Sequence, residues 1–309
     1  MAKKTKFIIG IDVGGTNTKI GLIKGHTIKS KLVLKTKQYF RKKDLLGAII
    51  KETQNLLKKN GLSKNDILGI GIGLPGAIDY KRGIVHYLPN IPGWKDVYLA
   101  RLMQQRCGIP TYIDNDVNLM ALAELHYGHG KGKTNIVCIT LGTGVGGGLI
   151  LEGRLYRGTD FAAGELGHIP VAIEGPSCSC GGKGCLESFI ANTRILKRAK
   201  QIFGPDITLE KLSSLANRGN SKAIKIWQEV GNFLGAALAG VVNLLNPQVI
   251  IIGGGVAGSG EILFNQVKKT IKERAMLIPK KEVRIKKAKV EEPGIIGAGI
   301  LVRGSLKLK

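Results

Sequence analysis

The chain has 309 residues, enough for one large domain or two of ordinary size, and two is the expected number. Hydrophobic residues make up 43% and charged residues 22%, values typical of a soluble globular protein, which exclude a disordered chain, a collagen and a coiled coil. The 47 basic and 22 acidic residues give a net charge of +25, which favours anionic partners such as nucleic acid, phosphate compounds or membrane surfaces.

The basic residues are nevertheless spread along the chain and cluster only at 29–43, at 280–289 and at the C-terminus. Runs of this kind are usually solvated, so we expect neither nucleic acid nor a membrane as a partner. No segment reaches the ~18 consecutive apolar residues of a membrane helix. The basic N-terminus leads into a glycine-rich turn and not into the apolar run of a leader, and we therefore expect a cytoplasmic protein.

The first part of the chain alternates strands and helices. Residues 7–23 predict a strand, a tight Gly-Gly turn and a return strand, and a third strand follows at 27–36. Apolar residues at helical spacing predict a helix over 44–60. The predicted elements that follow are a strand over 67–76 that runs into the loop GLPG, a short helix over 99–107, a strand ending at Asp114 and Asp116, and a helix over 118–127.

The same pattern restarts at Asn135. The segment ITLGTGVGGGLIL aligns with IDVGGTNTKIGLI near the N-terminus, which indicates an internal duplication. The later predicted elements are helices over 191–203, 221–245, 261–275 and 294–303, and strands within 246–260 and 283–288. Strands alternating with helices in two repeated halves predict an α/β protein with a cleft between two lobes.

The two predicted lobes have different lengths. Residues 1–116 are expected to form a small N-terminal α/β lobe, which the C-terminal helix (294–309) joins. Residues 117–293 are expected to form the larger α/β lobe, which contains a cysteine cluster.

The paired glycine turns suggest a clamp for phosphate groups, because glycines let backbone N–H groups approach an anion closely. In the first turn Asp12 precedes Gly14-Gly15-Thr16, where its carboxylate can hold a hydrated Mg²⁺. Thr16 can donate a hydrogen bond to a phosphate, and Lys19 can help to neutralise it. The alternative is an ordinary hairpin turn, in which Gly-Gly pairs are common.

A nicotinamide cofactor is a second alternative, since Gly142-x-Gly144-x-x-Gly147 and Gly253-x-Gly255-x-x-Gly258 both fit the dinucleotide fingerprint. The first continues into a strand and not into a helix. The second precedes a helix but lacks the expected acid at the end of the next strand. We therefore disfavour a dinucleotide site.

A metal site is indicated by His168, Cys178, Cys180 and Cys185, which supply one imidazole and three thiolates within a short segment. Four soft ligands at this spacing suit a closed tetrahedral Zn²⁺ site, and full coordination by the protein makes such a zinc structural. The alternative is three reduced thiols beside an unrelated histidine. Disulfides are not expected with only five cysteines and no leader.

Candidate sugar ligands lie around this cluster. Glu165, His168 and Glu187 bracket it, and Asn115-Asp116 ends a predicted strand, where open α/β sheets place ligands. Carboxylates and amides bind vicinal hydroxyls through paired hydrogen bonds. Considered alone, each glutamate is most simply interpreted as a charged residue on the surface.

Together these segments resemble the ROK family of sugar kinases and sugar-responsive repressors, within the actin, hexokinase and heat-shock ATPase superfamily. The resemblance runs from Ile8 to about Gly299 and is carried by IDVGGTNTKIGLI, YIDNDVNLMALAE, ITLGTGVGGG, GELGHIPV, CSCGGKGCLES and VIIIGGG. The pattern CxCGxxGC preceded by ExGH is specific to it, whereas the glycine turns alone are not. The resemblance implies a two-lobed, actin-like (ribonuclease H-like) α/β fold.

The resemblance also implies a role for each matched residue. Asp116 would be the catalytic base that takes the proton of the sugar's primary hydroxyl. The implied sugar ligands are Asn90, Asn115, Glu165, His168 and Glu187, with Gly76 close by. The implied ATP-binding residues are Asp12, Gly14, Gly15 and Thr16 in the first phosphate motif, Gly142, Thr143 and Gly144 in the second, and Gly254 and Gly255 facing the adenosine.

The implied activity is ATP-dependent phosphorylation of a hexose, with glucokinase activity, an entry step of glycolysis, expected first. N-acetylmannosamine, fructose, allose and broad hexokinase specificities stay open, as does the choice between a homodimer and a homotetramer. A sugar-responsive repressor is the alternative of a different class. We disfavour it because the first phosphate strand begins at Phe7, which leaves no room for a helix-turn-helix before it.

Overall fold

The computed structural model describes residues 6–39, 41–88 and 93–307, which divide into two compact units. Unit 1 comprises Met1–Gly128, Arg157–Ala163 and Val290–Lys309, and unit 2 comprises His129–Tyr156 and Gly164–Lys289. The expected lobe boundary at Asp116 falls at the start of a helix that stays in unit 1, where it packs against the C-terminal helix.

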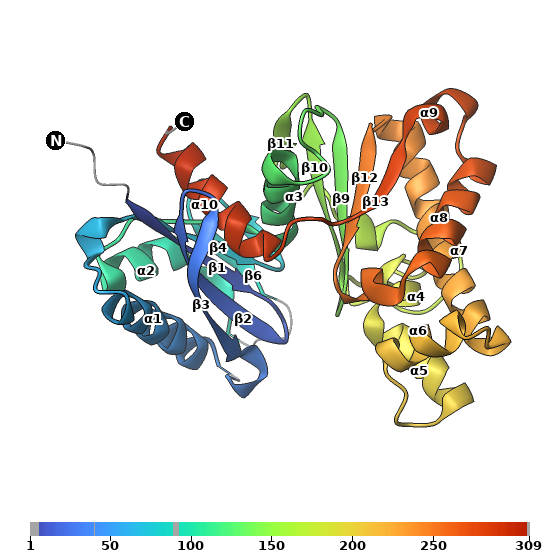
Figure 1. The fold of residues 1–309 in the computed structure, drawn as a ribbon, viewed down its shortest axis with the longest axis horizontal. Coiled ribbons are helices and arrows are strands. Elements are labelled where there is room, and N and C mark those ends of the chain that lie inside the picture. Colours follow the sequence, from blue (N-terminus) through green and yellow to red (C-terminus); the bar gives the residue numbers. More distant parts are fainter. Residues whose placement is uncertain (1–5, 40, 89–92, 308–309) are drawn as a thin grey trace. The chain divides into compact units, whose positions relative to one another are not determined.

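Unit 1 is built on a five-stranded sheet in the order β3-β2-β1-β4-β8 (Figure 1). Strand β2 is antiparallel to both β1 and β3, and β4 is parallel to both β1 and β8. The strands are β1 (Phe7–Val13), β2 (Asn17–Lys24), β3 (Thr27–Lys35), β4 (Ile67–Leu74) and β8 (Thr111–Asn115).

Helices cover both faces of this sheet. On one face α1 (Lys42–Lys59) and α2 (Leu99–Cys107) bury their apolar sides against residues such as Ile9 and Ile11. On the other face α10 (Pro293–Ser305) packs across β1 and β4 and against α3 (Asp116–Tyr127). Alternate residues of β1 therefore serve two separate cores.

Close approach of α10 to the sheet depends on glycines in the strands. A Cβ at Gly10 would lie 2.5 Å from the carbonyl oxygen of Ile295, and a Cβ at Gly71 would lie 2.8 Å from the carbonyl carbon of Ala298. Any larger residue at either position would push α10 away from the strands.

Unit 2 repeats the same topology with the order β11-β10-β9-β12-β13, in which β9, β10 and β11 are antiparallel neighbours and β12 is parallel to β9 and β13. The duplicated strand order explains why the two glycine-turn segments align in sequence. The strands are β9 (Ile136–Leu141), β10 (Val145–Leu151), β11 (Arg154–Tyr156), β12 (Val249–Gly253) and β13 (Arg284–Lys287).

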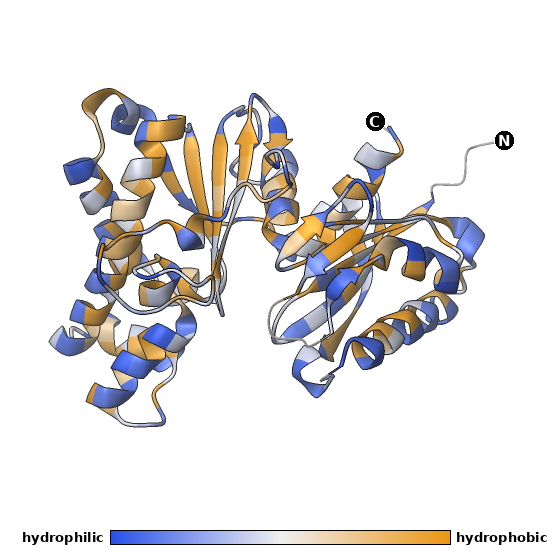
Figure 2. Cartoon of the chain, turned by 180° about the vertical axis from the view of Figure 1, so that it is seen from behind, coloured by the Kyte–Doolittle hydropathy of each residue, from blue (hydrophilic) through white to orange (hydrophobic). Residues whose placement is uncertain are grey.

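The core of unit 2 forms around α7 (Ser221–Leu245), whose buried side chains include Trp227 and Leu234. Strand β12 is buried at all five positions, and in Figure 2 the strands are mainly hydrophobic whereas the helices alternate hydrophobic and hydrophilic residues. The other helices of this unit are α4 (Glu187–Ile190), α5 (Asn192–Phe203), α6 (Leu209–Asn217), α8 (Glu261–Arg274) and α9 (Leu277–Glu282).

Some elements are absent from the sequence prediction. They include helices α4, α6 and α9, strand β11, and a three-stranded sheet of β5 (Ala77–Asp79), β6 (Ile84–Tyr87) and β7 (Lys95–Val97). Strands of three or four residues are too short to show a periodic pattern. In the part of the chain that the structure describes, no helix combines the length and apolarity that crossing a bilayer requires.

Candidate active site and metal centre

The first glycine turn joins β1 to β2 and is closed by a hydrogen bond from Gly14 N to Asn17 O of 3.0 Å. Gly15 and Thr16 are exposed at its tip, and the Thr16 carbonyl accepts from Thr36 N at 3.0 Å. The turn therefore presents its backbone to solvent from a fixed position.

Asp12 lies in β1 just before this turn and is partly buried. Burial raises the pKa of Asp12 to about 6, with Lys19 acting to lower it and Glu292 to raise it. Gly294, in the first turn of α10, lies against the Asp12 carboxylate, and a Cβ there would be 2.6 Å from Oδ2. A buried carboxylate of this kind suits a cation, because binding a positive charge offsets the cost of ionisation.

Lys19 has a partner that the sequence patterns did not indicate. Its Nζ lies 2.6 Å from Glu292 Oε2, and Lys31 Nζ lies 2.6 Å from Oε1 of the same carboxylate. Burial alone would raise the pKa of Glu292, but hydrogen bonds and charges from both lysines hold it below its ordinary value. The expected contact of Lys19 with a phosphate stays a prediction.

Asn115 and Asp116 lie where β8 passes into α3. Asn115 is the N-cap residue, and its Oδ1 accepts from Val117 N at 2.9 Å and from Asn118 N at 3.3 Å. Its Nδ2 donates to the Gly76 carbonyl at 3.4 Å, so three of the expected sugar-site residues are neighbours. Asp116 Oδ1 accepts from Val117 N at 2.9 Å, which orients this carboxylate at the helix start. The expected ligand Asn90 lies outside the described residues.

The second glycine turn joins β9 to β10 and is closed by Gly142 N donating to Gly144 O at 2.9 Å. Glu187 supports this turn, because its Oε2 accepts from Val145 N at 2.7 Å, and a Cβ at Gly144 would lie 2.7 Å from the same oxygen. Thr143, at the tip, is exposed.

Gly254 brings the third glycine loop to this turn. It has φ +85°, and a Cβ there would lie 2.7 Å from the backbone nitrogen of Leu141, at the end of β9. Gly255 follows at the start of a short 3-10 helix. The two glycine segments expected to bind nucleotide in the second half of the sequence thus lie together in unit 2.

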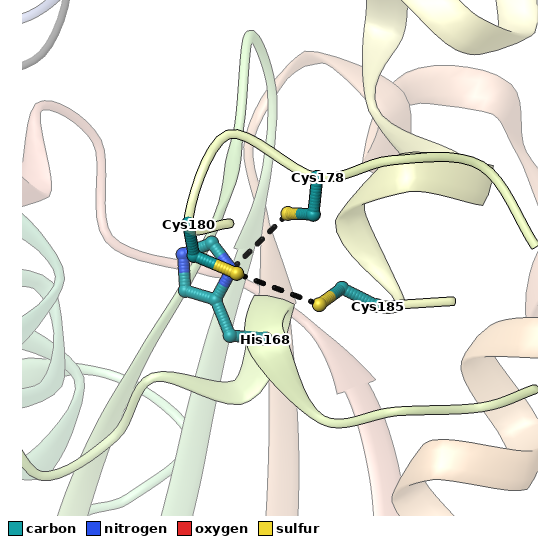
Figure 3. A group of neighbouring side chains, drawn as sticks. All are labelled: His168, Cys178, Cys180 and Cys185. Carbon is teal, nitrogen blue, oxygen red and sulfur yellow. Dashed lines mark hydrogen bonds between the residues drawn. The ribbon is translucent and has the colours of Figure 1, made fainter. Parts of the chain in front are cut away.

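His168, Cys178, Cys180 and Cys185 converge as expected of a metal site (Figure 3). Their ligand atoms all lie within 4.8 Å of one another, and the sulfurs of Cys180 and Cys185 are 3.7 Å apart. In a tetrahedral zinc site with Zn–S bonds of about 2.3 Å, the sulfurs lie about 3.8 Å apart. The geometry and the chemistry of the four donors therefore fit Zn²⁺.

Backbone hydrogen bonds shape the loop that carries the thiols. Cys178 N donates to Gly182 O at 2.8 Å, and Gly181 has φ +92°. A hydrogen bond from the Gly182 backbone lowers the pKa of Cys180, whereas burial raises that of Cys185 to about 12. A bound cation replaces the protons of such thiols, so we expect metal binding to depend on pH.

His168 is placed so that each ring nitrogen has its own neighbour. Nδ1 lies 3.5 Å from Cys178 Sγ, within the metal cluster, and Nε2 lies 3.8 Å from Glu165 Oε2. Burial raises the pKa of Glu165, with His168 lowering it and Glu187 raising it. The expected sugar ligands of unit 2 thus form one electrostatic neighbourhood beside the metal cluster.

The chain is similar to known proteins along nearly its whole length. Residues 8–305 match the profile of the ROK family. A glucokinase from Thermotoga maritima is 33% identical, over 96% of this chain and 97% of that protein. A ROK family glucokinase from Streptomyces griseus, solved in complex with glucose and AMPPNP, is 30% identical with a TM-score of 0.85, over 96% of this chain and 99% of that one. A ROK family transcriptional regulator, a homologue of E. coli Mlc, is 26% identical with a TM-score of 0.88, over 98% of this chain and 78% of that one.

Proposed function

Because this chain belongs to the ROK family and has the two-lobed, actin-like α/β fold of its ATP-dependent sugar kinases, we propose that it is a glucokinase. It would transfer the γ-phosphoryl group of ATP to the primary hydroxyl of glucose and release glucose 6-phosphate. The observation that carries this proposal is the Asn115-Asp116 pair, fixed at the start of α3 beside the Gly76 carbonyl.

The proposed role of Asp116 follows from the chemistry of phosphoryl transfer. The transition state is loose, so positioning and charge neutralisation supply most of the acceleration. Asp116 would orient the sugar hydroxyl towards the phosphorus atom and accept its proton late in the reaction. An ordinary carboxylate suffices for a late proton transfer.

The glycine turns and Asp12 would serve the nucleotide. Backbone N–H groups of Gly14–Thr16 and Gly142–Gly144 would donate to phosphate oxygens, and Gly254 and Gly255 would face the adenosine. Asp12 would hold a hydrated Mg²⁺, which supplies charge neutralisation when it is bound. The partly buried Asp12 carboxylate, whose pKa burial raises, supports a cation at this position.

The proposed zinc would be structural. Four protein ligands leave no open coordination position, so the metal would fix the loop and not activate water. The loop in turn would place Glu165, His168 and Glu187, which we propose as ligands of the sugar hydroxyls. His168 Nδ1 would bind the metal and its Nε2 would face the sugar, in agreement with the two neighbours of its ring.

A sugar panel tests the proposal. Purified protein would be assayed with ATP and Mg²⁺ on glucose, N-acetylmannosamine, fructose, allose and mannose. We expect the highest kcat/KM on glucose, at least tenfold above the others. A higher value on N-acetylmannosamine or fructose would replace glucose as the substrate, and no phosphorylation of any sugar would refute the kinase assignment.

The likeness to a transcriptional regulator supports a second candidate, a sugar-responsive repressor. We favour the kinase, because the glycine segments of both units and Asp12 suit a nucleotide and its cation, which phosphoryl transfer requires. Binding to DNA that persists at moderate salt would favour the repressor, since non-specific electrostatic binding falls steeply with salt.

We further propose a cytoplasmic homodimer, with a homotetramer as the alternative. An apolar patch supports self-association. It joins the end of α7 to the start of α9, where Met276 N donates to Asn243 Oδ1 at 2.8 Å. The patch consists of Leu244 (81% exposed), Met276 (66%), Leu277 (74%) and Ile278 (75%). Contiguous exposed apolar patches mark protein–protein interaction sites.

A further inference from the structure

The loop between β11 and Gly164 is closed on itself and belongs to unit 1. Ala163 N donates to the Arg157 carbonyl at 3.0 Å, which makes residues 157–163 a compact loop. These residues cluster with unit 1 although the residues on both sides belong to unit 2. Phe161 within the loop has φ +61°, a conformation that costs free energy for a bulky side chain and requires support from its surroundings.

Arg157 carries the main polar contact of this loop. Its Nε lies 2.9 Å and its Nη2 2.5 Å from Oδ2 of Asp114, at the end of β8. The Asp114 side chain is 2% exposed and that of Arg157 17%, so solvent does not screen this ion pair as it would at the surface. Removing one partner of a buried pair leaves an uncompensated charge, which is strongly unfavourable.

The other oxygen of Asp114 binds two residues that flank the proposed base, Asp116. Oδ1 accepts from Asn115 N at 2.8 Å and from Asn118 Nδ2 at 2.9 Å. One carboxylate therefore holds the backbone just before Asp116 and a side chain of the first turn of α3. The Arg157 guanidinium fixes that carboxylate from the opposite side.

Aromatic side chains hold the guanidinium in place. The Arg157 Cζ lies 4.0 Å from the ring centroid of Tyr80, and the Tyr80 ring meets that of Phe161 edge-on, with centroids 5.0 Å apart. Lys81 Nζ lies 5.3 Å from the Phe161 centroid. Stacking on an aromatic face holds the planar guanidinium in one orientation. A lysine at this position would not be held in this way, because its ammonium is not planar.

We propose that Arg157 is a positioning residue for the phosphoryl acceptor site and acts on Asn115 and Asp116 through Asp114. The proposal rests on the kinase function proposed above. It predicts that loss of Arg157 impairs turnover, because a small displacement of the base costs a large part of the rate. It also predicts that ATP binding is spared, since neither Arg157 nor Asp114 contacts the glycine turns in the described structure.

Kinetics of three variants test this role. We expect Arg157→Met to lower kcat by about tenfold to hundredfold, with the KM for ATP within about twofold of wild type. The double variant Asp114→Asn/Arg157→Met removes the unpaired charge but keeps an acceptor for Asn115 N, so its kcat should exceed that of Arg157→Met at least fivefold. Arg154→Met, at an exposed position on β11, is the matched control and should keep full activity.

Three results would overturn the proposal: a kcat of Arg157→Met above half that of wild type, a double variant no faster than the single one, or an equal loss in Arg154→Met. If Arg157→Met does not fold, Arg157→Lys replaces it. Its ammonium cannot make both contacts with Asp114, so kcat should fall at least threefold, and full activity would refute the role.

Hydrogen exchange separates this proposal from the kinase assignment, because it needs no turnover. The amides of residues 115–118 should exchange at least tenfold faster in Arg157→Met than in Arg154→Met. Unchanged exchange would refute the positioning role even if the wild-type protein phosphorylates glucose. Faster exchange together with no phosphorylation of any sugar would show that Arg157 fixes residues 115–118 and that it is the kinase assignment that fails.

Discussion

Asp12 and Asp116 are two carboxylates with different environments and therefore different expected behaviour. Both side chains are partly buried, but Asp12 lies against Gly294 of α10, where burial raises its pKa, whereas Asp116 lies at the start of α3. The sequence indicates both residues, because Asp12 precedes a glycine turn and Asp116 ends a predicted strand. It does not indicate Glu292 or Arg157, which come from distant segments and meet their partners only through the fold.

Asp116→Asn should abolish phosphorylation and leave sugar binding largely intact. The amide keeps an oxygen that can accept from Val117 N but cannot take a proton from the sugar. We expect kcat to fall about 1,000-fold, as is typical for loss of a general base. The dissociation constant for glucose, from isothermal titration, should change less than threefold. Turnover within tenfold of wild type would remove Asp116 from the catalytic role.

Asp12 should make the unliganded protein less stable as the pH rises from about 4 to 6. Its pKa is 3.8 in the unfolded chain and about 6 in the fold, so in this range the folded state holds more protons than the unfolded state. The free energy of unfolding therefore falls with pH, by about 3 kcal/mol at most from this group.

Asp12→Asn removes this dependence. Urea unfolding at pH 7.5 should show a gain in stability of about 2 kcal/mol over wild type, shrinking towards zero near pH 4. The exposed Asp206→Asn should show no such trend. Equal stability of Asp12→Asn and wild type at both pH values would contradict the burial argument. The same substitution should abolish Mg²⁺-dependent activity if Asp12 holds the cation.

At the scale of elements, periodic patterns predict the long helices and the strands of both sheets well. The helix predicted over 221–245 is α7, which has the same bounds. The role of the glycines in β1 and β4 is harder to predict from sequence. It depends on the close approach of helix α10, which lies more than 200 residues away along the chain. The metal cluster is readable from sequence because its ligands are local, whereas the Arg157–Asp114 pair has no local signature.

Gly10→Ala should destabilise the protein through the contact between β1 and α10. The new methyl group would lie 2.5 Å from the Ile295 carbonyl oxygen, so α10 would have to move. Overpacking of this kind costs about 1–3 kcal/mol. Gly47→Ala, at an open position of α1, should instead add up to about 1 kcal/mol of stability, since alanine favours helix. Thermal unfolding of both variants measures the contrast, and a Gly10→Ala protein as stable as wild type would refute it.

Removal of the proposed zinc should weaken sugar binding by disordering the loop from Glu165 to Glu187. Metal analysis should first show one zinc per chain in the untreated protein. Chelation, or Cys178→Ser, should then raise the dissociation constant for glucose at least tenfold in isothermal titration. Cys107→Ser, outside the metal cluster, is the control. Unchanged affinity of the metal-free protein would show that the loop is ordered without metal.

At the scale of the whole molecule, the two units share one strand order. The two aligned glycine-turn segments predict this duplication from the sequence. The net charge of +25 is not explained by a single site, because the basic residues are distributed over many elements. The apolar patch at α7 and α9 was not predicted, since exposure of Leu277 and Ile278 depends on how α9 packs.

The double variant Leu277→Asp/Ile278→Asp should be monomeric if this patch forms the proposed dimer. Two charges in an apolar interface cost more than the contact gains. Light scattering after size exclusion should show the mass of the wild type halved in the variant. Ile202→Asp, at an exposed position on α5, should leave the mass unchanged. A wild-type protein that is already monomeric would refute the dimer.

The return of α10 to unit 1 has a consequence for biosynthesis. Ribosomes complete every residue of unit 2 before they add Pro293, so unit 2 can fold on the emerging polypeptide. Ile8 and Ile23 pack against α10. They cannot be buried in this way until Ile295 and Val302 have been synthesised. The unit that is synthesised first is therefore the last to complete its core, and until then the apolar surface that α10 covers stays exposed.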